Sequence, residues 1–210
     1  PLLEHVARKG KPVLLSSGMS SLEELDTAVA TIRRHNNQLI VLHCTTVYPC
    51  PPDLVNLRVI PTLQSRFGVP IGFSDHSPHF YAALASIPLG ACVVEKHFTL
   101  SKRLYGPDHH ASLEPNEMAQ FVQAARIVEK TLGEPEKRLL PAVEGARAVF
   151  QHSVVSATHI QAGTSLDSSM LTIKRPGTGI PARELTTLYG YVARQDIPAN
   201  VQVRWEDLER

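Results

Sequence analysis

The sequence has few cysteines, no long apolar segment and almost no net charge. Its three cysteines, Cys44, Cys50 and Cys92, cannot all pair with one another, and none has zinc-ribbon spacing. Unpaired cysteines fit a reducing compartment, so we expect a cytoplasmic protein. No apolar run approaches the roughly 20 residues that span a bilayer. A net charge of +1 gives no electrostatic reason to bind nucleic acid or a membrane, and we expect neither as a partner.

Strand-like and helix-like segments alternate four times between residues 11 and 133. The predicted strands cover 12–15, 39–42, 69–73 and 91–95, and the predicted helices cover 21–35, 56–67, a stretch that begins at Pro78, and 114–132. Ser21 and Glu24 have the spacing of a capping box, and Gly68 gives the second helix a stop. This alternation favours a parallel sheet, either a small open sheet or half of a (β/α)8 barrel.

The pattern changes after residue 133. Glu134-Pro-Glu-Lys-Arg138 is charged and contains proline, as linkers do, and we assign residues 134–149 to a linker. No helical periodicity follows it. Short strands predicted at 153–157, 171–175 and 201–204, separated by glycine and proline, indicate a small β domain over residues 150–210.

Two apolar runs end in polar residues that can bind a metal. Ile71-Gly-Phe-Ser-Asp-His-Ser77 carries His76, and Val93-Val-Glu-Lys-His-Phe-Thr99 carries His97 one strand-helix-strand unit later. If both runs are parallel strands, both imidazoles emerge at the C-terminal edge of one sheet, where α/β active sites gather. There they could hold a divalent metal. The alternative is two unrelated histidines, one capping a helix and one in a loop.

The same two runs resemble a known family. Ser74-Asp-His76 and Glu95-Lys-His-Phe-Thr99 look like two signature motifs of the sialic acid synthases. The other matching blocks are Leu15-Ser-Ser-Gly-Met19, His43-Cys-Thr-Thr-Val-Tyr-Pro49, Gly106-Pro-Asp-His109 with Ser112-Leu-Glu-Pro115, and Lys174-Arg-Pro-Gly-Thr-Gly-Ile180. Six blocks in register across almost the whole chain make the resemblance specific.

The resemblance implies a fold. Residues 1–133 would be the second half of a (β/α)8 barrel, with four βα units, and residues 150–210 a β-rich SAF, or antifreeze-like, domain. Typical barrel size then predicts roughly 130 further residues upstream in the complete gene product. We expect the general acid and base residues to lie upstream of Pro1, and the 210 residues alone to be inactive. Half a barrel would also expose two strand edges.

The resemblance further implies a reaction. Members of the family condense phosphoenolpyruvate with an N-acetylmannosamine-type sugar, and phosphate leaves by C–O cleavage. His76 and His97 match the two histidines that hold the family's divalent metal, which polarises the sugar aldehyde as a Lewis acid. A site of histidine and water suits Mn²⁺, with Mg²⁺ or Co²⁺ as alternatives.

Substrate contacts follow from the same alignment of motifs. Phosphoenolpyruvate would be bound by Ser16, Thr46 and Ser74, and the sugar by Tyr48, Asp108 and Arg175. Ser16-Ser-Gly18 precedes a helix, so its backbone amides are expected to form an anion cradle. Thr46 departs from the asparagine of some members, although its hydroxyl can still donate. Arg175 matches an arginine that reaches into the partner subunit's barrel, which implies a domain-exchanged homodimer.

Several neighbouring residues receive other interpretations. Lys96 is read as a solvated or ion-paired lysine, with Glu95 as the candidate partner. Cys44 at a strand end is read as a packed thiol rather than a metal ligand, and His109 and His110 as parts of a polar loop. The block from His43 to Pro49 looks more like the legionaminic-acid branch of the family.

Two other functions compete with the synthase. One is a metal-dependent barrel hydrolase that uses His76 and His97 with a metal-bound hydroxide, although the sequence has no His-x-His pair at a strand end and no evident lysine-bridged centre. The other is a non-catalytic fragment that binds carbohydrate or dimerises. Stoichiometric binding of manganese would distinguish the enzymes from this fragment.

Overall fold

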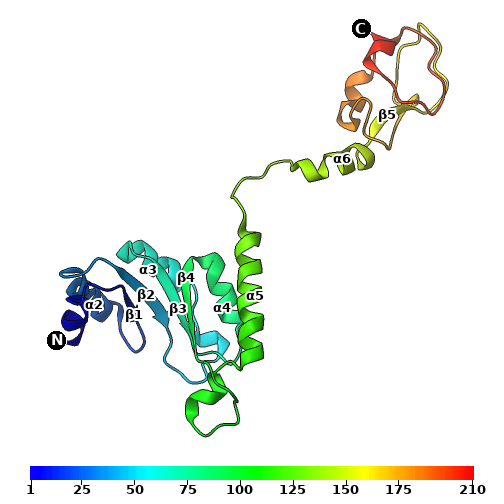
Figure 1. Cartoon of the computed structure of the whole chain (residues 1–210). Helices are drawn as coiled ribbons and strands as arrows, with labels where there is room; N and C mark the ends of the chain where they lie inside the picture. Colours follow the sequence, from blue (N-terminus) through cyan, green and yellow to red (C-terminus); the bar gives the residue numbers. More distant parts are fainter. The chain divides into compact units, whose positions relative to one another are not determined.

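The computed structural model describes all 210 residues, which form two compact units, Pro1–Glu134 and Pro135–Arg210. In unit 1 four strands form one parallel sheet in the order β1-β2-β3-β4 (Figure 1). This confirms the predicted alternation of strands and helices. The elements are α1 (Leu2–Ala7), β1 (Val13–Ser16), α2 (Leu22–Arg33), β2 (Leu39–Cys44), η1 (Pro52–Leu54), α3 (Val59–Phe67), β3 (Ile71–Asp75), α4 (Tyr81–Ser86), η2 (Ile87–Leu89), β4 (Ala91–Lys96), η3 (Pro107–Ala111) and α5 (Pro115–Leu132).

Local signals set most helix ends. Ser21 Oγ accepts from the Glu24 amide, and the Glu24 carboxylate accepts from the Ser21 amide at 2.8 Å, which completes the predicted capping box. Gly68 ends α3 in the left-handed conformation, with φ of 59°. Two predicted starts are wrong, because α3 begins at Val59 rather than 56 and α4 at Tyr81 rather than Pro78.

The late start of α4 has a local cause. The Ser77 amide donates to Asp75 Oδ1 at 2.8 Å, and Ser77 Oγ donates to the carbonyl of His79 at 3.0 Å. These side-chain bonds hold residues 75–79 in a turn that competes with a helix. Pro78 therefore lies within the turn and not at a helix start.

The two faces of the sheet have different surroundings. Side chains alternate along a strand, and the helix-covered face carries Val13, Val41, Ile71, Phe73 and Val94. The first four pack with α2 and α3, and Val94 packs with α4 and α5. The opposite, helix-free face carries Ser16, Cys44, Gly72, Ser74 and Glu95, each one position away from a residue whose side chain points to the helices.

An irregularity in β4 sets which of its residues reach each face. Ile71 pairs with Ala91, but Phe73 pairs with Val94, so β4 contains one extra residue between these two pairs. Gly72 lies at this bulge, and a Cβ on it would come within 2.4 Å of the Leu42 side chain and 2.8 Å of the Val93 carbonyl. After the bulge, Ser74 pairs with Glu95 and Asp75 with Lys96.

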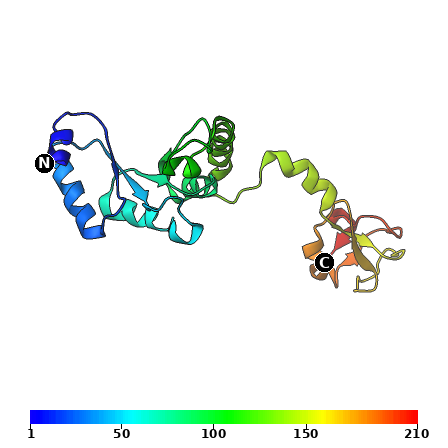
Figure 2. The same ribbon diagram turned by 90° about the horizontal axis from the view of Figure 1, so that it is seen from below.

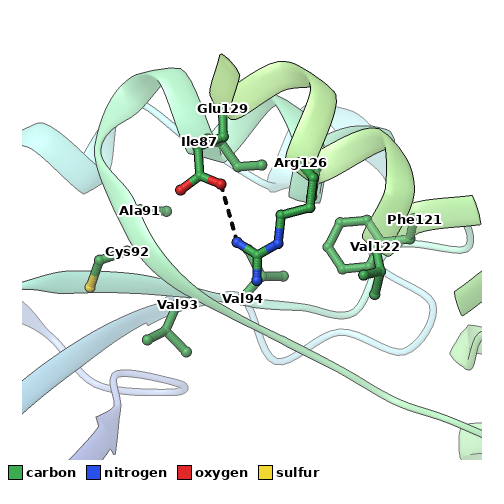
Figure 3. Close-up of a pocket in the computed structure, with 10 residues that line it drawn as sticks. Ile87, Ala91, Cys92, Val93, Val94, Phe121, Val122, Arg126 and Glu129 are labelled. Carbon is green, nitrogen blue, oxygen red and sulfur yellow. Dashed lines mark hydrogen bonds and ion pairs between the residues drawn. The ribbon is translucent and has the colours of Figure 1, made fainter. Parts of the chain in front are cut away.

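β4 forms one edge of the sheet, and a hollow of about 220 Å³ lies between it, η2 and α5. Figure 3 shows this hollow, lined by Cys92, Val94 and Phe121 and crossed by the ion pair of Arg126 with Glu129 at 3.1 Å. Both ion-pair side chains are largely exposed. His97 does not line this hollow.

Unit 2 consists mainly of short strands and loops around one small core (Figure 2, yellow to red). β5 pairs antiparallel with β6, and β7 with β8. Its elements are η4 (Pro141–Val143), α6 (Glu144–Phe150), β5 (Ser153–Ser156), β6 (Leu171–Lys174), η5 (Ala182–Leu188), β7 (Val192–Ala193), η6 (Trp205–Asp207) and β8 (Leu208–Glu209).

Two features of this part of the chain were not predicted in detail. The stretch 134–149, predicted as a linker, contains η4 and most of α6, which is too short to show a helical period. The segment 201–204 is not a regular strand. An isolated antiparallel bridge pairs Gln202 with Val155 of β5. The Val201 amide donates to Ser156 Oγ at 3.1 Å instead of to a backbone carbonyl of β5, which interrupts the ladder.

None of the helices in either unit combines the length and the apolar character that crossing a membrane requires.

Candidate functional site

Two imidazoles meet where β3 and β4 end. The last paired residues of these strands are Asp75 and Lys96, and His76 and His97 follow them directly. The two ring centroids are 5.1 Å apart with an interplanar angle of 57°. The predicted convergence of both histidines at one sheet edge is therefore present in the structure.

Hydrogen bonds orient the ring of His76. Its Nδ1 lies 3.0 Å from the Thr45 carbonyl, which can only accept, so Nδ1 carries the proton and Nε2 keeps its lone pair. Such a carbonyl partner is the usual outer contact of a metal-binding histidine. The His76 carbonyl accepts from the Cys50 amide at 2.9 Å, which fixes the backbone as well.

Cys44 lies on the protonated side of that ring. Its Sγ is 3.8 Å from His76 Nδ1 and 3.8 Å from Thr46 Oγ1. A thiol beside Nδ1 does not share an ion bound at Nε2. The position agrees with the interpretation of Cys44 as a packed thiol.

The donor set fits a sparsely coordinated divalent ion. Unit 1 contains no group of three or more histidine, cysteine or acidic side chains that could hold a metal. Two imidazole nitrogens leave several coordination positions for water or substrate oxygens, an arrangement that suits Mn²⁺ and similar ions. The metal role of His76 and His97 remains a prediction.

A carboxylate that was predicted only as an ion-pair partner of Lys96 lies beside this pair. Glu95 Oε1 accepts a hydrogen bond of 2.8 Å from Ser74 Oγ. Ser74, Glu95, Lys96 and His97 line a cavity of about 200 Å³. Glu95 is two residues before His97, and the alternation of side chains along β4 was the available signal that both reach the same face.

Tyr48 packs against both histidines. Its ring centroid is 4.1 Å from that of His76 and 5.6 Å from that of His97, and 41% of the residue is exposed. Desolvation raises the pKa of the Tyr48 phenol above its ordinary value, and the charges of Cys44, Asp108 and Glu95 raise it further. The phenol therefore stays protonated near neutral pH and can donate a hydrogen bond to a sugar oxygen.

The two remaining residues predicted to bind phosphoenolpyruvate lie at the ends of β1 and β2. Thr46 lies two residues after β2, and its hydroxyl contacts the backbone of Gly18, where a Cβ would come within 2.3 Å of Thr46 Oγ1. Ser16 ends β1 with an exposed side chain on the helix-free face. Gly18 and Thr46, each two residues after a strand, are therefore packed together, while no contact joins Ser16 to Thr46.

The predicted anion cradle needs correction. The Ser17 amide donates to the Leu42 carbonyl at 3.0 Å, and Ser17 Oγ donates to the same carbonyl at 2.9 Å. α2 begins only at Leu22, so the amides of residues 16–18 are not its N-terminus. The Ser17 amide belongs to the connection with β2 and is not available to an anion.

Asp108 lies in a loop with its own internal bonds. It is exposed in η3, and its carbonyl accepts from Ser112 Oγ at 2.7 Å. His109 Nδ1 is 2.7 Å from Thr99 Oγ1, so His109 helps to shape the loop. No contact in the structure assigns a role to His110.

The partner of Lys96 is Asp75 and not Glu95. Lys96 Nζ lies 3.2 Å from Asp75 Oδ2, and both side chains are almost fully buried, with 1% and 0% exposed. The contact is an ion pair without hydrogen-bond alignment, since Oδ2 has no hydrogen-bond partner. Burial lowers the pKa of Lys96 below its ordinary value, and the charge of Asp75 opposes this change.

Arg175 follows β6 in unit 2. Its Nε donates to the Phe150 carbonyl at 3.1 Å, and its guanidinium lies 5.4 Å from the centroid of the Phe150 ring. The peptide bond from Arg175 to Pro176 is cis. Its guanidinium nitrogens other than Nε have no partner within unit 2, and its sugar-binding role stays a prediction.

Comparison with known proteins covers both units. Residues 1–137 match the NeuB family, and residues 151–209 match the SAF domain. The chain is 36% identical over 214 residues to N,N'-diacetyllegionaminic acid synthase of Legionella pneumophila, with 100% of this chain and 60% of that protein covered. It is 39% identical over 211 residues to N-acetylneuraminate-9-phosphate synthase of Mus musculus, with 100% and 59% covered. The chain thus spans about three fifths of these relatives.

Solved structures agree with the predicted fold class. A putative spore coat polysaccharide biosynthesis protein E from Chromobacterium violaceum has a TM-score of 0.68 at 29% identity, with 100% of this chain and 64% of that chain covered. N-acetylneuraminic acid synthetase from Leptospira borgpetersenii has a TM-score of 0.64 at 36% identity, with 69% and 51% covered. The predicted α/β fold, a half-barrel followed by a SAF domain, is confirmed.

Proposed function

The chain belongs to the NeuB family and carries a SAF domain, and on this premise we propose that the complete gene product is a nonulosonic acid synthase. It condenses phosphoenolpyruvate with an N-acylated mannosamine-type sugar and releases phosphate. The observation that carries the proposal is the meeting of His76, His97 and Tyr48 beside the hydrogen-bonded pair of Ser74 and Glu95. Relatives of the chain include synthases of legionaminic, pseudaminic and neuraminic-type acids, and this supports the same reaction class.

The bonds made and broken define what the site must do. C3 of phosphoenolpyruvate forms a carbon–carbon bond to the aldehyde carbon of the open-chain sugar, whose oxygen gains a proton. Water adds at C2, and the C2–O bond to phosphate breaks. The site must therefore bind a phosphate and a carboxylate, hold sugar hydroxyls and stabilise negative charge on the aldehyde oxygen.

His76, through Nε2, and His97 would hold a divalent ion, with Mn²⁺ the best match to two imidazoles and open positions. When bound, such an ion supplies Lewis-acid polarisation of the aldehyde. The Thr45 carbonyl keeps the proton of His76 on Nδ1, so the binding nitrogen stays free. Mg²⁺ and Co²⁺ are the alternatives.

We assign the remaining roles by chemistry. Hydroxyl groups of Ser16 and Thr46 donate to the phosphate or carboxylate of phosphoenolpyruvate, and the Ser74 hydroxyl would leave its bond to Glu95 to donate to the same substrate. The protonated phenol of Tyr48 donates to a sugar oxygen. Glu95, held by Ser74 at 2.8 Å, is a carboxylate that can exchange a proton with a reacting oxygen.

Asp108 and Arg175 complete the proposed sugar contacts. The exposed carboxylate of Asp108 can accept hydrogen bonds from sugar hydroxyls. Arg175 would bind the N-acyl group in a domain-exchanged homodimer, in which the partner subunit supplies it. The sedimentation velocity of the complete gene product tests the dimer, and Arg175→Ala tests the contact through the KM for the sugar.

One segment of the sequence favours one class of sugar substrate. The Cys-Thr-Thr-Val-Tyr-Pro segment from Cys44 to Pro49 favours a 2,4-diacetamido-2,4,6-trideoxy sugar over N-acetylmannosamine. Overall identity does not separate the branches, since the two relatives above match at 36% and 39%. An assay that supplies each sugar separately therefore decides between the two substrates.

The test is phosphate release from phosphoenolpyruvate by the complete gene product with Mn²⁺. N-acetylmannosamine and 2,4-diacetamido-2,4,6-trideoxymannose are supplied separately, and His76→Ala is assayed in parallel. We expect release with one sugar and its loss in the variant. A folded protein that binds Mn²⁺ but releases no phosphate with either sugar contradicts the synthase and favours a hydrolase. A folded protein that binds no Mn²⁺ favours a carbohydrate-binding or dimerising role.

A further inference from the structure

A buried ion pair lies directly behind the two histidines. Asp75 precedes His76 on β3, and Lys96 precedes His97 on β4, and the two charged residues are paired in the register of the sheet. By the alternation of side chains they point to the helix-covered face while the histidines point to the other. Lys96 Nζ and Asp75 Oδ2 are 3.2 Å apart, with the two side chains 1% and 0% exposed.

The pair also binds the backbone of the turn that carries His76. Asp75 Oδ1 accepts from the Ser77 amide at 2.8 Å, and Lys96 Nζ donates to the Ser77 carbonyl. Both backbone polar groups of the residue after His76 are thus satisfied by the pair. The Cys50 amide holds the His76 carbonyl itself.

These contacts join the two strand ends at one point. Lys96 belongs to the strand that carries His97, yet its ammonium group bonds to the turn that carries His76. A displacement of that turn would break a hydrogen bond and part of an ion pair in a region without solvent. The separation of the two imidazoles is therefore coupled to this contact.

We propose that Lys96 and Asp75 are positioning residues that fix the spacing of His76 and His97 and thereby set the affinity for a divalent ion. The inference rests on the proposed metal site. Desolvation makes a buried ion pair expensive, and apolar residues of similar volume often stabilise a fold equally well. Apolar residues could not satisfy the amide and the carbonyl of Ser77 together, which is the function that distinguishes this pair from simple packing.

The test measures Mn²⁺ affinity by electron paramagnetic resonance of the free ion, in the complete gene product without substrates. The variants are Lys96→Met, Lys96→Arg and the double variant Asp75→Asn with Lys96→Met. The double variant removes both charges, so it leaves no unpaired buried charge. Arg66→Met is the matched control, because Arg66 pairs with the exposed Asp26 between α2 and α3. Thermal unfolding is followed for each protein.

We expect Lys96→Met and the double variant to bind Mn²⁺ about 10- to 100-fold more weakly, the range for lost outer contacts of metal ligands. Lys96→Arg keeps a donor and a charge and should recover most of the affinity, and Arg66→Met should bind as the wild type does. A folded double variant with wild-type affinity overturns the inference and leaves the metal site standing. A wild-type protein that binds no Mn²⁺ overturns the metal site and this inference with it.

Discussion

The helix-covered and helix-free faces of the sheet are built from alternate residues of the same four strands. On the helix-covered face Val41, Ile71 and Phe73 are at most 2% exposed and pack against helices. On the helix-free face of this half-barrel Leu14 is 48% exposed, Leu42 is buried beside Gly72, and positions at the strand ends, such as Ser74, are polar. The difference teaches that stability and chemistry reside in neighbouring residues, so that each can be changed separately.

The last pair of residues departs from this division. Asp75 and Lys96 place two charges at the end of the apolar face, directly behind the histidines. At this end of the strands, two residues of the helix-covered face hold the turn that carries His76. The comparison therefore predicts that most substitutions in the sheet affect either stability or ligand binding. Only substitutions of Asp75 and Lys96 should affect both.

The largest expected effect is on stability, from the helix-covered face. Phe73→Ala should lower the free energy of unfolding by about 3–5 kcal/mol, because it removes a buried ring and leaves a cavity. Urea denaturation of the 210-residue chain measures this. Leu14→Ala is the control on the other face, because Leu14 is 48% exposed in this chain, and should cost less than about 1 kcal/mol. Equal losses in both variants would remove the distinction between the faces.

The second effect is on metal affinity, from the helix-free side. His97→Ala should weaken Mn²⁺ binding by more than about 100-fold, since it removes one of two protein donors and exceeds the loss from an outer contact. Isothermal titration calorimetry measures the affinity, and thermal unfolding without metal should be nearly unchanged. His5→Ala, on the exposed side of α1, should alter neither. Unaltered affinity in His97→Ala would contradict the metal site.

The third effect is on substrate binding. Ser74→Ala should raise the KM for phosphoenolpyruvate about tenfold, as expected for the loss of one hydrogen bond to a charged group. The KM for the sugar should change little. Steady-state kinetics with each substrate varied in turn measures both constants. A rise only in the KM for the sugar would contradict this role and assign Ser74 to sugar binding.

The smallest effect concerns pH and the helix-covered face. His43 is buried, and desolvation lowers its pKa below the ordinary value of 6.5, against the bond of 2.7 Å to the Val55 carbonyl. Below that value the unfolded chain takes up a proton before the folded one does, so the free energy of unfolding falls as pH falls. His43→Gln keeps a donor but does not titrate. Denaturation between pH 7 and 5 should show a weaker pH dependence in the variant, and an equal dependence would contradict the assignment.

Local patterns in the sequence predict much of unit 1. The apolar runs give the four strands, and the Ser21 capping box and Gly68 give helix ends that the structure confirms. These features depend on residues close together in the chain. The predicted start of α4 was wrong because of another local feature. The hydrogen bonds that Ser77 makes in the turn compete with the helix that was expected to begin at Pro78.

Contacts between strands were harder to predict from the sequence. The convergence of His76 and His97 follows from parallel strands ending at one edge, but the pairing of Lys96 with Asp75 rather than its neighbour Glu95 depends on register. Register across the β4 bulge is not visible in the sequence. In unit 2 the short strands lack a clear period, so β7 and β8 were missed and α6 was taken for linker.

The extra residue in β4 acts like a reading frame for the sheet. Upstream of it Ala91 pairs with Ile71, and downstream of it Lys96 pairs with Asp75. Deleting Cys92 would only remove the bulge and leave Lys96 paired with Asp75, whereas inserting one residue beside Cys92 would pair Glu95 with Asp75 and turn Lys96 toward the site. Two carboxylates would then be buried together, and an ammonium group would lie on the same face as the His76 imidazole. A single-codon insertion in β4 would thus exchange the charges of the site without changing the identity of any residue in it.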